Sequence, residues 1–325
     1  MPQNIFNGII GHAHVQEVLN RMVETDQVPH AFLFLGANHL GKTLVATQLI
    51  RSLFPGMGSF DANPDIVELS CLIDEKTGKK KSNISAEQVR ELCERLSLSS
   101  MNGGWKVAFI KDASALSTGA ANALLKTLEE PKGKMLFILR APSLESVLPT
   151  VASRCQVVRF HSVPRIDLVA AMVKKGFARP DAEVAAAISL GKPGRALRYL
   201  TKSEDKSNID VGTSQALHLF SSSIATQLKT SAELLPKEDV NKKHAAEHVV
   251  ARWQGVLRDV MLEKIGCTEL VAHQNELHGI KSLGKTFALE QIIHTLHTAE
   301  ESRAALAHNT NPLLTLEHIL LNAHV

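Results

Sequence analysis

An octapeptide at residues 36–43 constrains the fold of this chain more than any other feature. It reads Gly-Ala-Asn-His-Leu-Gly-Lys-Thr and matches the pattern G-x4-G-K-T. A short apolar run, residues 31–35, ends just before it, and residues 44–54 have the periodicity of a helix. In a strand, loop and helix of this kind, glycines let backbone amides surround phosphate oxygens, and the helix N-terminus adds partial positive charge. The octapeptide therefore predicts an α/β fold with a nucleotide-binding loop.

The loop contains the candidate cofactor-binding residues Gly36, Gly41, Lys42 and Thr43. The Lys42 ammonium would neutralise charge on the β- and γ-phosphates, and the Thr43 hydroxyl would hold Mg²⁺. We expect weak binding of ATP or ADP, with Mg²⁺. The alternative is a vestigial loop that keeps its shape without useful affinity.

Apolar runs and helical patterns alternate along the first half of the chain. Ser85 and Gln88 have the spacing of a capping box, which marks the start of a helix. The apolar runs lie at 66–69, 107–110, 135–139 and 156–160, and the helical patterns lie at 13–24, 85–97 and 118–130. Strands that alternate with helices predict a doubly wound parallel sheet.

After residue 161 the strand signals stop. Residues 163–203 have the pattern of a small helical unit, residues 201–208 read as a polar linker, and residues 211–325 read as helices. The apolar faces of 246–265 and 289–308 exceed what so small a helical unit needs internally. We therefore expect this last part to form oligomers.

Composition excludes several classes of protein. The chain has 325 residues, a net charge of +3 and only 4% aromatic residues, unlike a dedicated nucleic-acid binder or a base-stacking platform. No apolar run is long enough to span a membrane, and the first residues lack a signal-peptide pattern, so we expect a cytoplasmic protein. The 4 cysteines form no CxxC pair and are expected to be buried free thiols.

Several segments resemble the AAA+ subunits of bacterial DNA polymerase III clamp loaders, in the order in which that family has them. They are Gly11-His12, residues 29–34 (PHAFLF) with the phosphate loop, residues 122–131 (NALLKTLEEP), Ser153-Arg154-Cys155, residues 191–197 (GKPGRAL) and residues 309–317 (NTNPLLTLE). The last of these resembles the end of the delta-prime type of subunit. The resemblance covers almost the whole chain.

The resemblance implies three parts: a RecA-like AAA+ domain at 1–162, a helical lid at 163–205 and an all-α collar at 206–325. It implies a hetero-pentamer with gamma/tau and delta subunits that acts on the sliding clamp and on primer-template DNA. Many family members carry a four-cysteine zinc module, but residues 54–63 contain no cysteine, so we expect no zinc.

The resemblance also separates a stator-like, delta-prime type from an ATP-hydrolysing motor subunit. In motor subunits the strand before the 122–131 motif ends in Asp-Glu, whereas Lys111 and Asp112 occupy those positions here. An ammonium there repels a divalent cation. The sensor-1 position falls near Ala141, which has no hydrogen-bonding side chain. We therefore expect weak or absent ATPase activity, unless a shift by one residue restores Asp112 as the metal ligand.

Two arginines receive roles from the resemblance. Arg154 would act in trans as an arginine finger on a neighbouring subunit's γ-phosphate, and Arg195 would contact bound nucleotide from the lid. The alternatives are a local ion pair for Arg154 and a structural ion pair for Arg195. The basic loop 76–81 is either a solvated turn or a contact to DNA phosphates. The rival functions are a gamma/tau-type motor subunit and an unrelated AAA+ ATPase.

Overall fold

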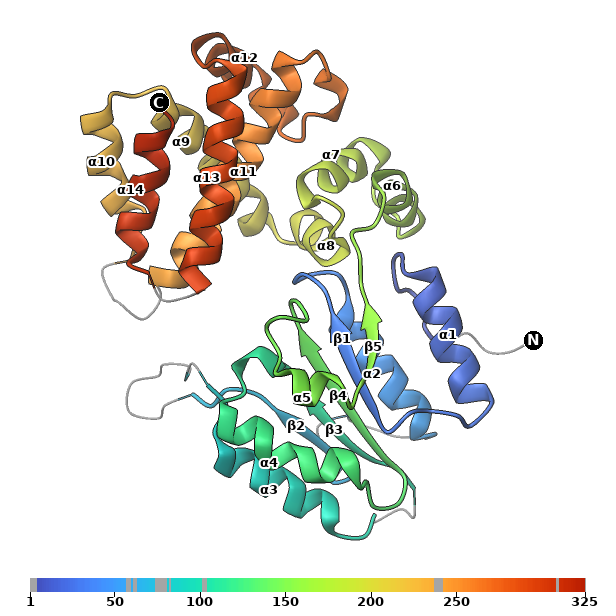
Figure 1. Ribbon diagram of the computed structural model, residues 1–325. Coiled ribbons are helices and arrows are strands. Elements are labelled where there is room, and N and C mark those ends of the chain that lie inside the picture. Colours follow the sequence, from blue (N-terminus) through green and yellow to red (C-terminus); the bar gives the residue numbers. More distant parts are fainter. Residues whose placement is uncertain are drawn as a thin grey trace. The chain divides into compact units, whose positions relative to one another are not determined.

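The computed structural model describes residues 5–56, 60, 63–73, 81, 83–100, 104–236, 242–307 and 310–324. The chain divides into two compact units (Figure 1). Unit 1 comprises residues 1–171 and 191–195, and unit 2 comprises residues 172–190 and 196–325. The three-part division at 162 and 205 stays a prediction.

Unit 1 contains a five-stranded sheet in the order β2-β3-β4-β1-β5, and every neighbouring pair is parallel. The strands are β1 (Ala31–Leu35), β2 (Ile66–Leu69), β3 (Lys106–Ile110), β4 (Met135–Ala141) and β5 (Gln156–Arg159). The predicted doubly wound sheet is confirmed. β1 and β3 are buried along their whole length, as expected for strands covered by helices on both faces.

Helices cover both faces of this sheet. They are α1 (Ala13–Glu24), α2 (Lys42–Leu53), α3 (Ala86–Ser97), α4 (Thr118–Glu129) and the short α5 (Pro149–Ala152). Figure 1 shows α1 and α2 on one side and α3 and α4 on the other, which agrees with two separate apolar clusters. Alternate residues of β1 divide between them: Phe32 and Phe34 pack with α2, and Leu33 packs with α3 and α4. The capping box of Ser85 and Gln88 at the start of α3 is confirmed.

The rest of the described chain is helical, which confirms the prediction for the second half. The helices are α6 (Arg165–Lys174), α7 (Arg179–Ser189), α8 (Pro193–Thr201), α9 (Ser203–Phe220), α10 (Ile224–Glu233), α11 (Lys242–Lys264), α12 (Leu277–Thr286), α13 (Leu289–Ala307) and α14 (Pro312–Asn322). Among the described residues, no helix has the length and apolar character needed to cross a lipid bilayer.

The predicted linker at 201–208 is wrong, because α9 begins at Ser203. Among the side chains that the structure describes, those of α9 in the helical core, such as Leu217 and Phe220, lie in its second half. A polar first half carries no apolar periodicity, so it reads as a linker although it continues the same helix.

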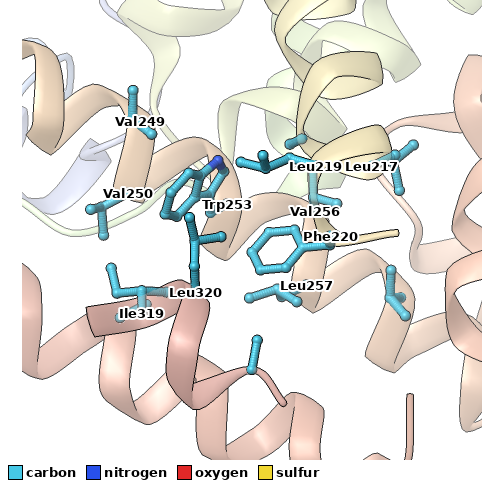
Figure 2. Packing of buried hydrophobic residues seen from close by; sticks show 14 of the residues in the cluster. Leu217, Leu219, Phe220, Val249, Val250, Trp253, Val256, Leu257, Ile319 and Leu320 are labelled. Atoms are coloured by element: carbon cyan, nitrogen blue, oxygen red, sulfur yellow. The ribbon is translucent and has the colours of Figure 1, made fainter. Parts of the chain in front are cut away.

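The apolar faces of α11 and α13 lie inside unit 2, which corrects the argument that they are surplus. Trp253 of α11 is 2% exposed and meets Phe220 of α9 edge to face, with ring centroids 5.6 Å apart. Ile319 and Leu320 of α14 converge on the same cluster (Figure 2). Because these side chains are buried within the unit, they are no evidence for oligomer formation.

Candidate nucleotide-phosphate site

The phosphate loop follows β1, at the carboxyl-terminal ends of the parallel strands. The Gly36 amide donates to the Ala141 carbonyl at 3.2 Å, which ties the loop to the end of β4. In open parallel sheets, ligands bind in the crevice outside these carboxyl ends. The fold therefore places the octapeptide where a phosphate ligand is expected.

The two glycines of the loop serve different purposes. Gly36 has φ 141°, and a Cβ there would lie 2.5 Å from the Phe160 carbonyl oxygen, so the fold itself requires glycine. Gly41, the N-cap residue of α2, has φ 98°, yet a Cβ there would meet nothing within 4 Å. The space beside Gly41, at the helix N-terminus, is open and fits an anion.

The Lys42 side chain lies inside the loop. It is buried, and its Nζ donates to the carbonyl oxygens of Gly36 and, at 2.8 Å, of Ala37. Burial and, to a smaller extent, the charge of Arg140 lower the pKa of Lys42 to about 8, although Asp112 opposes the shift. The Thr43 side chain is exposed at the first turn of α2. A bound phosphate group would lower the free-energy cost of burying the Lys42 ammonium. The loop therefore fits a phosphate ligand.

Two segments far away in sequence support the loop. His12 Nε2 lies 2.9 Å from the Leu40 carbonyl, and its ring meets Phe160 edge to face. Burial lowers the pKa of His12, although the hydrogen bond with Leu40 opposes the shift. The Gly194 amide donates to the His39 carbonyl at 2.9 Å, and Arg195 follows directly. The fold thus brings the backbone of the 191–195 segment to the loop, while nucleotide contact by Arg195 stays a prediction.

The side of the site where a metal ligand would be expected carries an ion pair instead. Lys111 follows β3, and its Nζ pairs with Glu68 of β2. The Asp112 carboxylate accepts from the amide and hydroxyl of Ser114 and caps a short 3-10 helix. Ala141 is buried at the end of β4. The carboxylates of Glu68 and Asp112 therefore already have partners.

Arg140 is a residue of the site that the sequence analysis missed. Its Nε and Nη2 donate to the Lys111 carbonyl at 2.9 and 2.6 Å, and its Cζ lies 5.8 Å from the centroid of the Phe109 ring. Burial lowers the pKa of its guanidinium, and Asp112 and Glu68 oppose that shift. The signal in the sequence was an arginine directly after the apolar run 135–139, at the end of a buried strand.

Apart from the exposed hydroxyl of Thr43, the donor set fits Mg²⁺ poorly. Mg²⁺ takes oxygen ligands, usually one or two carboxylates besides water and phosphate. Lys42 and Arg140 both act electrostatically on this site, and Glu68 is paired with Lys111. Within the described ranges, no group of three or more His, Cys, Asp or Glu residues could hold a metal ion.

Arg154 lies away from the loop, in the turn between α5 and β5. Its guanidinium donates to the Glu129 carboxylate through Nε, at 2.9 Å, and Nη2, and to the Thr150 carbonyl through Nη1, at 2.8 Å. Its side chain remains 33% exposed. The local ion pair that the sequence left open is therefore present in this chain, and action in trans stays a prediction.

The cysteines are free thiols, as expected, but of the four only Cys71 is buried and the others are half-buried. Burial raises the pKa of Cys155 to about 12. Three segments with sequence predictions lie wholly or partly outside the described residues: the basic loop 76–81, residues 54–63 and residues 309–317. Their predicted roles stay predictions.

A parallel five-stranded sheet, a phosphate loop after β1 and a glycine-rich segment that contacts this loop define unit 1 as a P-loop domain of the AAA+ type. Residues 11–164 match the family model described as "DNA polymerase III, delta subunit". The matched segment is similar to that family and to delta-prime subunits of DNA polymerase III.

Individual relatives agree with this assignment. The delta-prime subunit of Haemophilus influenzae is 39% identical over 141 residues, which cover 43% of this chain and 41% of the relative. The delta-prime subunit of Escherichia coli is 38% identical over 120 residues, 37% of this chain and 36% of the relative. A gamma/tau subunit of Mycobacterium bovis is 32% identical over 168 residues, 49% of this chain and 29% of the relative. The chain thus spans less than half the length of these relatives.

Proposed function

We propose that this protein is a stator-like, delta-prime-type subunit of a DNA polymerase III clamp loader. It would assemble with gamma/tau and delta subunits in a hetero-pentamer and help to place the sliding clamp on primed DNA. One observation carries the proposal: Lys111 at the end of β3 is paired with Glu68 while the phosphate loop after β1 is intact. By the resemblance, Lys111 occupies the position of a motor subunit's metal-binding carboxylate. The family match of residues 11–164 supports it.

The chemistry follows from this replacement. Phosphoryl transfer to water needs a metal that neutralises developing charge and a residue that orients the attacking water. Lys111 cannot hold the metal, and the methyl group of Ala141 cannot hydrogen-bond the γ-phosphate. We therefore propose that the chain binds ATP or ADP weakly and hydrolyses ATP at a negligible rate.

Arg154 is the residue through which this subunit would act on a neighbour. An arginine finger needs a planar guanidinium that stays protonated and spreads charge over several phosphate oxygens. Glu129 and Thr150 hold the Arg154 fork at a defined place in the turn before β5. In the assembly, we propose, a γ-phosphate bound to the neighbouring subunit takes the place of Glu129.

Reconstituted loaders test this role. Loaders that contain Arg154→Ala should hydrolyse ATP more slowly, because one site loses a group worth roughly 10³ to 10⁵ in rate. Total hydrolysis should fall only in part, since the other sites keep their own fingers, and clamp loading should fall more. Arg154→Lys keeps the charge but loses the fork, so it should rescue poorly. Unchanged hydrolysis and clamp loading with Arg154→Ala would leave Arg154 as a structural residue.

The second candidate is a gamma/tau-type motor subunit, favoured by the 32% identity to the mycobacterial relative. A steady-state ATPase assay on the purified chain separates the two. A turnover near 1 per second, at the low end of ordinary enzymes, that Lys42→Ala abolishes would establish the motor. A rate indistinguishable from that of Lys42→Ala supports the stator.

A further inference from the structure

The charges around the phosphate loop do not follow the pattern of a metal-assisted nucleotide site. Lys42, Arg140 and Lys111 supply cations, and Asp112 and Glu68 supply carboxylates. Lys111 and Glu68 pair with each other, so their charges largely cancel. Asp112 acts on both remaining cations. The site therefore carries a net positive charge from its own side chains, before any metal is added.

Arg140 is held rigidly beside the loop. It stands opposite Phe34 in the register of β4 and β1, two residues before the loop begins at Gly36. The next residue, Ala141, accepts the hydrogen bond from the Gly36 amide. The guanidinium is fixed by the Lys111 carbonyl and the Phe109 ring. A cation fixed in this way needs no reorganisation to meet an anion at the loop.

Arg140 also has donors to spare. Its two bonds to the Lys111 carbonyl use Nε and Nη2. Within the described part of the chain, the N–H groups of Nη1 have no hydrogen-bond acceptor. Guanidinium groups bind phosphate oxygens through paired, charge-assisted hydrogen bonds, which are about twice as strong as neutral ones. Burial, which lowers the pKa of Arg140, makes the gain of an anionic partner larger.

The same arrangement disfavours a divalent cation. Mg²⁺ would enter the electrostatic field of both Lys42 and Arg140. One oxygen of each nearby carboxylate is already bonded, Oε2 of Glu68 to Lys111 and Oδ1 of Asp112 to Ser114. A phosphate group meets two cations at this site, whereas a metal ion meets two repulsive charges.

We propose that this loop binds the polyphosphate of a nucleoside di- or triphosphate without Mg²⁺, and that Arg140 supplies the neutralising charge that the metal supplies in hydrolysing relatives. The inference rests on the proposed nucleotide binding at this loop. It replaces the sequence prediction that Mg²⁺ accompanies the nucleotide.

Calorimetric titration of the full chain with ADP and with ATP tests the inference, once with EDTA and once with excess Mg²⁺. The affinity in EDTA should equal or exceed that in Mg²⁺. Arg140→Ala should weaken binding in EDTA about tenfold or more, because a hydrogen-bonded charge is lost. The affinity of Arg140→Lys in EDTA should lie between those of the unmodified chain and of Arg140→Ala. This variant keeps the test usable if Arg140→Ala folds poorly. Arg51→Ala, at an exposed position in the last turn of α2, removes the same charge elsewhere and should change little.

The outcomes separate this inference from the proposed function. Lys42→Ala should abolish binding in both buffers, which shows that the loop is the site. If the unmodified chain binds in neither buffer, nucleotide binding itself fails, and this inference fails with it. If binding occurs but needs Mg²⁺, or if Arg140→Ala leaves the affinity in EDTA unchanged, only the inference is overturned. If Mg²⁺ raises the nucleotide affinity and Asp112→Asn removes that increase, Asp112 is the metal ligand instead.

Discussion

The two sides of the candidate nucleotide-phosphate site differ in what they retain. The loop side keeps the left-handed Gly41, the buried Lys42 and the helix N-terminus of α2. The strand side, at the ends of β3 and β4, carries Lys111, Arg140 and the apolar Ala141, whereas a hydrolysing site needs a metal-binding carboxylate and a polar sensor. Binding depends mostly on the backbone of one loop, while hydrolysis depends on side chains of other strands. A chain can therefore lose the second property and keep the first.

Among the variants that test this contrast, Gly36→Val should have the largest effect. A Cβ at position 36 would collide with the Phe160 carbonyl oxygen, and φ 141° disfavours a side chain. We expect the free energy of unfolding of unit 1 to fall by roughly 3 kcal/mol or more. Urea titration in a Trp253→Phe background, which leaves Trp105 as the remaining tryptophan, would report on unit 1.

Gly133→Val is the matched control. Gly133 also has a left-handed φ, of 70°, but a Cβ there would meet nothing within 4 Å. It should cost only about 1–2 kcal/mol, the strain of the backbone alone. Equal losses for both variants would contradict the collision at Gly36.

The second largest effect that we expect is a loss of nucleotide affinity at high pH. The pKa of Lys42 in the free chain is about 8, because burial disfavours its charge, and a bound phosphate would raise it. Binding then takes up a proton above that pH, so the contribution of Lys42 is complete below pH 8 and is lost as pH rises. The affinity should fall by up to about tenfold per pH unit above 8. Calorimetry from pH 7 to 10 measures the slope.

Lys42→Arg separates this titration from other effects of pH. Arginine stays protonated throughout this range, so the affinity of the variant should be flat with pH even if it is weaker. An equal slope in both proteins would mean that another group titrates.

A smaller effect is expected for Gly41→Ala. Its Cβ meets no protein atom within 4 Å, so only the left-handed φ of 98° opposes it. We expect a loss of about 1–2 kcal/mol in the free energy of unfolding. We also expect nucleotide affinity to fall about tenfold, because the methyl group enters the open space where the phosphate would lie. If Gly41→Ala lowers the free energy of unfolding but leaves the nucleotide affinity unchanged, the ligand binds elsewhere.

The smallest effect concerns the ion pair on the strand side. The side chains of Lys111 and Glu68 are 39% and 30% exposed, so solvent screens their attraction. A double-mutant cycle with Lys111→Ala and Glu68→Gln should give a coupling energy below about 1 kcal/mol. A much larger value would show that the pair is a main support of the sheet and not a replacement for a metal ligand.

Local sequence determined the parts of this protein that depend on neighbours in the chain. The spacing of Gly36, Gly41 and Lys42 is enough to define a phosphate loop, because its backbone bends within a few residues. Ser85 and Gln88 fix the start of α3 through hydrogen bonds that span three residues. The strands of unit 1 were readable because each is a short apolar run that lies between helices.

Tertiary structure decided what depends on contacts between distant segments. Arg140 became a partner of the loop only because β4 lies beside β1 in the sheet, and Lys111 met Glu68 only because β3 lies beside β2. The apolar faces of α11 and α13 read as surplus until the fold packed them with α9 and α14. Apolar periodicity gives the face of a helix that is buried but not the surface that buries it, and a side chain's charge does not reveal its partner. The pairing of strands and the packing of helices supplied both.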